Sequence, residues 1–116
     1  MIRGIGLDIV AEDEVAGWLD WSEERWEKTL APCERKERIE RGWKARHLAA
    51  RIAAKEALFK ATGLSFRPWE VGVVREDGAP GFWLSERMGN ALEGYVLHLS
   101  LTHAGGVAAA VVVVEE

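Results

Sequence analysis

Cysteine is almost missing from this chain of 116 residues, since Cys33 is the only one. A single cysteine cannot form a disulfide within the chain or supply a cysteine metal cluster, so we expect a cytoplasmic protein. No apolar run reaches the roughly 18 residues that a membrane-spanning helix needs. The apolar part of the first ten residues is short and contains Asp8, which argues against a signal peptide.

A positive charge excess is also absent, because the formal net charge is −4 at pH 7. This gives no electrostatic reason to expect a nucleic-acid partner, and we expect no membrane partner either. The hydrophobic fraction of 48% is high enough for a packed core and too high for a disordered chain. We therefore predict one domain over 1–116.

The order of sequence patterns predicts an α+β fold. Strands are indicated by alternating apolar residues, helices by the 3.6-residue period, and turns by glycine and proline. The expected elements are a strand over 2–10, a helical region over 12–30, a helix from Pro32 to Gly63, a hairpin turning at Asp77 and Gly78, a helix over 85–94, and strands over 95–103 and 106–116. This order predicts a mostly antiparallel sheet packed with a long central helix.

The central helix carries two charges among its apolar residues. At about 100° per residue, Lys55 falls inside the stripe of Leu48, Ile52 and Phe59, and Glu56 lies on its edge. A buried charge without a partner costs on the order of several kcal/mol, so both side chains need a partner or a water-filled cleft. A buried ion pair, or a lysine reaching out at a subunit contact, is as good an interpretation as a functional site.

The first strand adds a second carboxylate. Asp8 lies on the same strand face as Gly4 and Gly6, where the missing side chains leave room for another backbone or a ligand. Alone, Asp8 would be interpreted as the cap of the next helix. Together with Glu56 it forms a pair of carboxylates of the kind that binds Mg²⁺, which completes its shell with water and substrate phosphate.

The late strand ends in hydroxyl and imidazole groups before a glycine turn. Thr102 and His103, with Lys60, form a candidate anion site, although a lone histidine at such a position is more often a surface residue. Ser100 and His103 also raise nucleophilic catalysis, but no G-x-S-x-G motif or orienting acid supports it.

Five segments together resemble a known family. GIGLDIV, AARIAAKEALFKATG, WEV, DGAPGFWL and LSLTHAGGVAAAVVVVE follow the order and spacing of holo-acyl-carrier-protein synthases, the small phosphopantetheinyl transferases. The resemblance covers nearly the whole chain. It implies the phosphopantetheinyl transferase fold, a homotrimer with sites between subunits, and transfer of 4′-phosphopantetheine from coenzyme A to a carrier-protein serine with release of adenosine 3′,5′-bisphosphate.

The resemblance also implies roles for single residues. Asp8 and Glu56 resemble the Mg²⁺ ligands, and Lys55 resembles a lysine that assists the departing phosphate. Glu56, directly or through a metal-bound water, is the nearest base for the serine proton. The positions that resemble coenzyme A contacts are Lys60, Gly63, Pro80, Thr102 and His103.

The segment after the first strand departs from the family. Relatives place basic residues there, where they meet an acidic carrier protein, whereas this chain has Asp13 and Glu14. Arg25 and Lys28 remain and, with Trp18, are candidate carrier contacts. The loop after residue 63 is also shorter than in many relatives.

Two alternatives to the enzyme stay open at this point. The chain could be a family member turned into a non-catalytic binding or regulatory subunit, which the acidic segment favours. It could also be a structural trimer in which Lys55 and Glu56 pair at an interface.

Overall fold

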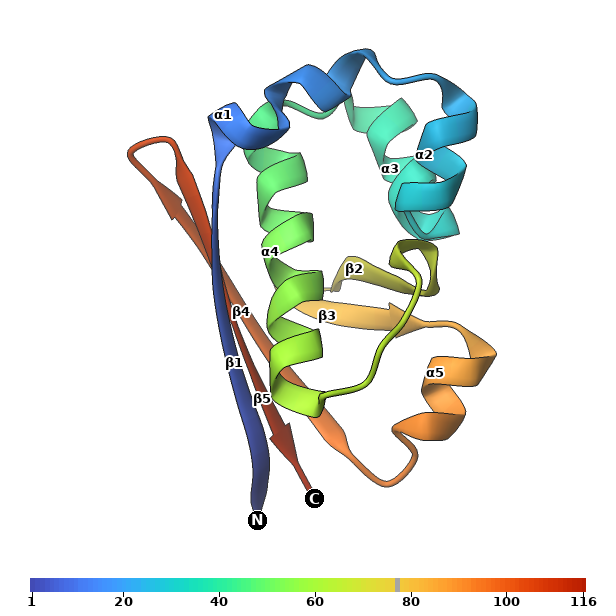
Figure 1. Cartoon of the computed structure of the whole chain (residues 1–116), viewed down its shortest axis with the longest axis vertical. Coiled ribbons are helices and arrows are strands. Elements are labelled where there is room, and N and C mark those ends of the chain that lie inside the picture. Colours follow the sequence, from blue (N-terminus) through green and yellow to red (C-terminus); the bar gives the residue numbers. More distant parts are fainter. Residues whose placement is uncertain (77) are drawn as a thin grey trace.

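The computed structural model describes residues 1–76 and 78–116 and has an α+β fold (Figure 1). Its strands are β1 (Ile2–Ala11), β2 (Val71–Glu76), β3 (Ala79–Leu84), β4 (Val96–Ala104) and β5 (Val107–Glu115). Its α-helices are α1 (Glu12–Val15), α2 (Glu23–Thr29), α3 (Pro32–Arg41), α4 (Ala45–Thr62) and α5 (Glu86–Ala91). Two short 3₁₀ helices, η1 (Ala16–Asp20) and η2 (Pro68–Glu70), connect them.

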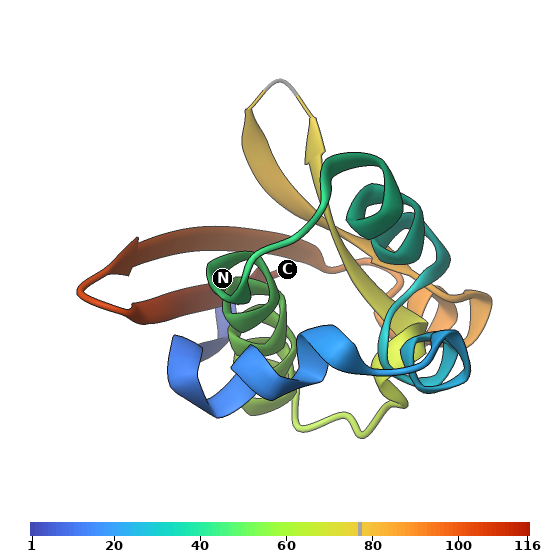
Figure 2. The same ribbon diagram turned by 90° about the horizontal axis from the view of Figure 1, so that it is seen from above.

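The strands form two antiparallel sheets packed around α4. The larger sheet has the order β1-β5-β4, and β2 pairs with β3 in the smaller one. Helix α4 crosses the inner face of the larger sheet, while α2, α3 and the smaller sheet lie on its other side (Figure 1). Strand β5 alternates accordingly, with Ala108, Ala110, Val112 and Val114 buried against the core. The two hairpins, β2–β3 and β4–β5, project in different directions (Figure 2).

Helix α4 touches β1 directly at the two glycines of GIGLD. A Cβ placed on Gly4 would lie 1.9 Å from the carbonyl oxygen of Ala61, and one on Gly6 would lie 1.9 Å from that of Ala57. The expectation that these glycines admit another backbone is therefore confirmed. Asp8, two residues further along the same face, is thus held beside the helix.

The expected helix from Pro32 to Gly63 is wrong as one element. It is interrupted at Gly42, whose φ of 65° lies in the left-handed region and ends α3. Helix α4 starts again at Ala45, and Gly63, with φ of 70°, ends it as expected. Sequence periodicity gives no sign of the break, because α3 consists mostly of charged residues and Ile39, its one large apolar side chain, is 68% exposed.

The helical region over 12–30 is also divided. Helix α1 ends at Val15, η1 follows, and α2 begins only after Ser22. The Ser22 hydroxyl accepts a hydrogen bond from the N–H of Arg25 at 3.3 Å, so it caps a new helix. Ser22, a residue type that favours helix N-termini, was the sequence signal that a second helix begins inside this region.

The remaining elements agree with expectation. The β2–β3 hairpin is present, although Asp77 in its predicted turn lies outside the described residues. Ser85 caps α5, which is three residues shorter than the predicted 85–94 at its end, since the chain turns between Leu92 and Gly94. Gly105 and Gly106 form the β4–β5 turn with φ of 58° and 79°. Within the described part of the chain, no helix is both long and apolar enough to cross a bilayer.

Candidate functional site

Asp8 and Lys60 form an ion pair where β1 meets α4. The Nζ of Lys60 lies 3.0 Å from Oδ1 of Asp8 and donates to the carbonyl oxygen of Leu7 at 3.1 Å. The Asp8 side chain is 17% exposed and that of Lys60 is 50% exposed. The pair is therefore open to solvent on the lysine side, and a ligand can reach it.

Glu56 lies one helical turn before Lys60 and shares its face of α4. It is exposed and makes no hydrogen bond or ion pair with residues in the described part of the chain. The contact of Gly6 with Ala57 places Asp8 beside this part of the helix. Asp8, Glu56 and Lys60 thus form one group of two carboxylates and a cation, which we call the carboxylate group.

The carboxylate group fits Mg²⁺ in its chemistry. Among residues 1–76 and 78–116 no cluster of three or more His, Cys, Asp or Glu side chains is close enough to enclose a metal ion. Two carboxylates with an open side are the donor set of a cation that keeps several waters and takes phosphate oxygens, as Mg²⁺ does. Asp8 and Glu56 as ligands remain a prediction.

An apolar cavity of about 460 Å³ adjoins Glu56. We call it the tryptophan cavity, because Trp18 and Trp21 stack over it with ring centroids 4.4 Å apart. Its lining consists of Trp18, Trp21, Thr29, Ile52, Lys55, Glu56, Phe59, Ser65, Phe66 and Pro68. The cavity offers an apolar binding surface next to the exposed carboxylate.

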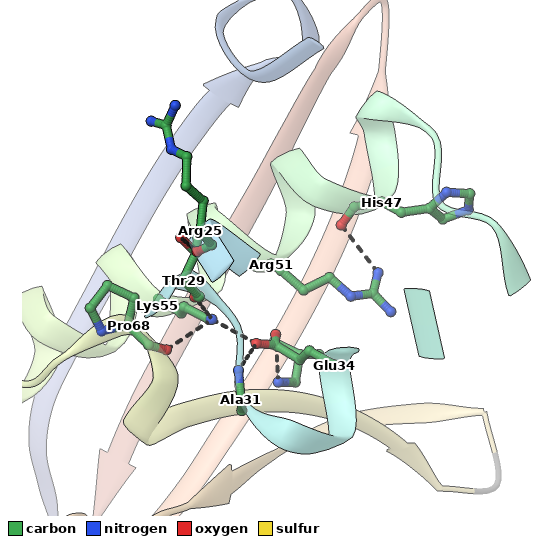
Figure 3. Close-up of polar contacts among 9 residues, drawn as sticks. Arg25, Thr29, Ala31, Glu34, His47, Arg51, Lys55 and Pro68 are labelled. Atoms are coloured by element: carbon green, nitrogen blue, oxygen red, sulfur yellow. Dashed lines mark hydrogen bonds and ion pairs between the residues drawn. The ribbon is translucent and has the colours of Figure 1, made fainter. Parts of the chain in front are cut away.

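Lys55, which is among the residues that line this cavity, is buried in an ion pair (Figure 3). Its Nζ lies 2.6 Å from Oε1 of Glu34 and donates to the carbonyl oxygens of Thr29 at 3.1 Å and Pro68 at 3.0 Å. The side chains of Lys55 and Glu34 are 5% and 0% exposed. Of the interpretations left open by the sequence, the structure shows a buried ion pair, and the partner is Glu34 rather than Glu56.

A contact of Lys55 with the departing phosphate stays a prediction. A lysine ammonium has three N–H donors, and three acceptors already surround this one. The half-exposed lysine beside the carboxylate group is Lys60.

His103 lines a second, basic cavity of about 290 Å³ at the start of α4. We call it the arginine cavity; its lining consists of Glu37, Arg41, Trp43, Arg46, His47, Ala50, Arg51, Arg75 and His103. Arg51 is held by Glu37 at 2.8 Å and by the carbonyl oxygen of His47 at 3.3 Å. Burial, then the charges of Arg46 and Arg51, lower the pKa of His47. Such a cavity favours anions.

The two sites use different stretches of α4. The arginine cavity takes its α4 residues from the first turns of the helix, over 46–51, whereas Glu56 and Lys60 lie in its last two turns. Within one chain His103 therefore belongs to the arginine cavity and not to the carboxylate group. Thr102 is exposed on the outer face of β4, Gly63 is exposed at the end of α4, and Pro80 lies on β3.

No protein-family model matches the chain. A holo-[acyl-carrier-protein] synthase of Mycolicibacterium smegmatis is 36% identical over 127 residues, which cover 99% of this chain and 98% of that protein. The synthase of Mycolicibacterium paratuberculosis is 38% identical, covering 98% and 97% of the two chains. The chain belongs to the holo-acyl-carrier-protein synthase family.

Solved synthases share the fold described above. The crystal structure from Neisseria meningitidis aligns with a TM-score of 0.89 at 30% identity, with both chains covered completely. The synthase from Bacillus anthracis, in complex with CoA (3′,5′-ADP), aligns with a TM-score of 0.79 at 30% identity, covering 100% of this chain and 98% of that one. The predicted fold and family are confirmed.

The carrier contacts predicted for this synthase-family chain lie at the rim of the tryptophan cavity or on α2. Trp18 is half-buried in the cavity wall. The Arg25 guanidinium lies 4.0 Å from the centroid of the Trp21 ring, and Lys28 lies 3.7 Å from Glu24. Both cations are exposed, Lys28 is partly neutralised by Glu24, and their role toward a carrier stays a prediction.

Some residues of the site were missed by the sequence interpretation. Glu34 stands in the highly charged run CERKERIER, where nothing distinguishes the one buried carboxylate. Arg41, Arg46 and Arg75 come from three separate elements, α3, α4 and β2. The repeated arginines at positions 41, 46 and 51 were the sequence signal that could have indicated this basic cavity.

Proposed function

We propose that this chain transfers the 4′-phosphopantetheine group of coenzyme A to a serine of an acyl carrier protein and releases adenosine 3′,5′-bisphosphate. The observation that carries the proposal is the carboxylate group, an open pair of carboxylates with a lysine, in a chain of the synthase family. The activity is that of a holo-acyl-carrier-protein synthase.

The reaction needs the negative charge that builds up at the β-phosphate of coenzyme A to be stabilised. Asp8 and Glu56 would hold Mg²⁺, which supplies positive charge to the phosphate oxygens when bound. The serine oxygen forms a bond to the β-phosphorus, and the phosphorus–oxygen bond to the bisphosphate breaks. Glu56 is exposed and accepts the serine proton directly or through water.

Lys60 is placed to meet the charge on the leaving side. The bisphosphate departs with its negative charge on a phosphate oxygen. Because Lys60 uses two acceptors and is half-exposed, it retains a donor for that oxygen. Lys55, for which we predicted this role, has no such donor left.

The arginine cavity supports binding of the nucleotide part of coenzyme A. Arginine recognises phosphate through paired N–H donors, and four arginines line this cavity together with His103. We propose His103 and Thr102 as contacts from one subunit, and Lys60, Gly63 and Pro80 as further contacts.

Sites of this kind are completed by a second subunit, and we propose a homotrimer. The outer face of β1 leaves Ile5, Leu7 and Ile9 between 59% and 62% exposed, beside the half-buried valines of β5. A row of apolar side chains on a sheet is expected to be covered. Packing it against a neighbour lets His103 of one chain approach the carboxylate group of another.

Mass spectrometry of a carrier protein tests the activity. An apo acyl carrier protein is incubated with coenzyme A, Mg²⁺ and this chain, and a gain of one phosphopantetheine is the expected result. An unchanged carrier mass, with a carrier that a characterised synthase modifies, would contradict the proposal and favour the binding or regulatory subunit.

Complementation tests the shared sites. Asp8→Ala and His103→Ala variants are each expected to be inactive, and a refolded mixture is expected to regain part of the activity. Light scattering at the working concentration must show a trimer. A monomer, or a mixture as inactive as its parts, would contradict the shared-site arrangement.

A further inference from the structure

We propose that Lys55 is a positioning residue, which together with Glu34 fixes the wall of the tryptophan cavity and does not touch the phosphates. The kinetic part of this inference rests on the proposed transfer activity. The structural part concerns only how residues 64–70 are held against α4.

One ammonium joins three segments of the chain. Lys55 extends from α4 and contacts the carbonyl oxygen of Thr29 at the end of α2, that of Pro68 in η2, and the carboxylate of Glu34 in α3 (Figure 3). Thr29, Lys55 and Pro68 all line the tryptophan cavity. The wall of this cavity is therefore assembled around one charged group.

Glu34 anchors the network to the rest of the fold. Its Oε1 also accepts from the N–H of Ala31 at 3.0 Å, and its Oε2 accepts from the N–H of Val73 at 3.1 Å. The carboxylate thus connects the start of α3 with β2 and orients the Lys55 amine toward Pro68. A fully buried carboxylate with this many donors is held in one geometry.

The same segment is fixed independently from the side of α5, near both of its ends. Arg87 of α5 donates to Glu70 at 2.7 and 2.8 Å and to the carbonyl oxygen of Ser65 at 3.0 Å. Residues 64–70 are therefore held from the α5 side by Arg87 and from the α4 side by Lys55. Removing Lys55 alone frees the side that adjoins Glu56.

The test compares Lys55→Met with the double variant Lys55→Met/Glu34→Gln. The single variant leaves Glu34 buried without its cation and is expected to unfold easily. The double variant removes both charges of this buried pair, keeps similar side-chain volumes, and still provides no donor for Pro68. Lys60→Met is the matched control, because it makes the same chemical change on the exposed part of the same helix.

Amide hydrogen exchange is the readout that does not depend on activity. The N–H of Arg67 donates to Glu70 Oε1 at 2.8 Å, and that of Glu70 donates to the carbonyl of Arg67 at 2.9 Å. In the double variant we expect both amides to exchange about fivefold faster or more, with β5 unchanged, because local opening becomes easier. In Lys60→Met we expect no change.

Kinetics supply the second readout. In the double variant we expect the KM for the carrier protein to rise about fivefold or more while kcat changes less than about threefold, because the cavity wall and not the phosphate chemistry is altered. Lys60→Met is expected to lower kcat instead. Unchanged amide exchange in the double variant, or a lower kcat at unchanged KM, would overturn the proposal. If the wild-type chain transfers nothing, the proposed function fails, and the exchange experiment alone decides the role of Lys55.

Discussion

Two lysines five residues apart on α4 differ in nearly every respect except that each pairs with a carboxylate. Lys55 is 5% exposed, its partner Glu34 is fully buried, and three oxygens surround its amine. Lys60 is 50% exposed, its partner Asp8 is partly exposed, and two oxygens contact its amine. The first pair faces the interior and the second faces the solvent at the β1 edge.

The difference in burial separates a lysine whose charge holds the fold together from a lysine whose charge is free to contact a ligand. A buried ammonium with three acceptors contributes to stability only as a unit with its partner, and removing one member leaves a buried charge. A half-exposed ammonium with a free donor can rearrange toward a ligand at little cost to the fold. Sequence periodicity detects the first kind as an anomaly and overlooks the second, since an exposed lysine on a helix surface is ordinary.

The largest expected effect lies in the exposed pair. Asp8→Asn and Glu56→Gln should each lower the transfer rate about a hundredfold or more, because one charged ligand of the group is lost. Both variants should stay folded, since Asp8 loses one ion pair with a half-exposed lysine and Glu56 makes no hydrogen bond or ion pair in the described part of the chain. The rate is measured by the mass gain of the carrier, and folding by thermal unfolding.

A chelator extends this experiment to the wild-type chain. Excess EDTA should stop transfer, and added Mg²⁺ should restore it. Full activity in the chelator, or in either carboxylate variant, would contradict the metal assignment of Asp8 and Glu56.

The buried pair should dominate stability. Lys55→Met is expected to cost about 3–5 kcal/mol in the free energy of unfolding, because Glu34 remains buried without its cation. Lys60→Met should cost at most about 1 kcal/mol. Urea unfolding of the two variants measures the difference directly. Equal losses would show that burial does not distinguish the two lysines.

Much of the fold was predictable from local patterns. Local sequence patterns determine the strand at GIGLD, the hairpins and the cap at Gly63. These patterns are the positions of glycines and the alternation of apolar and polar residues, and both involve only neighbouring residues. The break at Gly42 was not predicted, because α3 is filled with charged residues and has no apolar stripe whose end would mark it. Deciding between a tolerated helix glycine and a left-handed end requires the tertiary path of the chain.

The site was predictable only in part. The resemblance selected Asp8, Glu56 and Lys60; the structure pairs Asp8 with Lys60 and places Glu56 one helical turn before Lys60, and their roles stay predictions. It also placed Lys55 at the phosphate, whereas the partner that holds Lys55 is 21 residues away. Such long-range pairing has no sequence period, so the buried partner of a lysine cannot be read from one sequence.

A third carboxylate sharpens the comparison through its pH dependence. Hydrogen bonds from Arg87 and from the Arg67 N–H lower the pKa of Glu70 from 4.5 to about 2. A lowered pKa means that this contribution to stability is complete above pH 4.5 and is lost as the pH falls toward 2. Glu70→Gln should therefore be less stable near neutrality, by on the order of 5 °C in Tm. It should also lose less stability than wild type on acidification.

Thermal unfolding between pH 2 and 7 measures this difference, with the exposed Glu24→Gln as the control. An identical acid dependence of wild type and Glu70→Gln would contradict the assignment. The buried Glu70 would then behave like an exposed carboxylate, although four hydrogen-bond donors surround it.

The smallest expected effect concerns the exposed acidic surface beside the tryptophan cavity. Asp13, Glu14 and Asp20 are exposed, so an acidic carrier protein should meet repulsion there. Lys28 is partly neutralised by Glu24, which leaves Arg25, over the Trp21 ring, as the main cation to offset it.

Salt screens such repulsion beyond about 10 Å at 0.1 M. Raising the salt concentration should therefore lower the KM for an acidic carrier, and Glu14→Arg should lower it as well, with kcat nearly unchanged because this surface does not contact the phosphates. The change is expected to be about two- to fivefold, as is usual for exposed charges. A preference for a less acidic carrier follows from the same repulsion. If the KM for an acidic carrier rises steeply with salt instead, attraction by Arg25 and Lys28 dominates this surface, and the preference for a less acidic carrier is wrong.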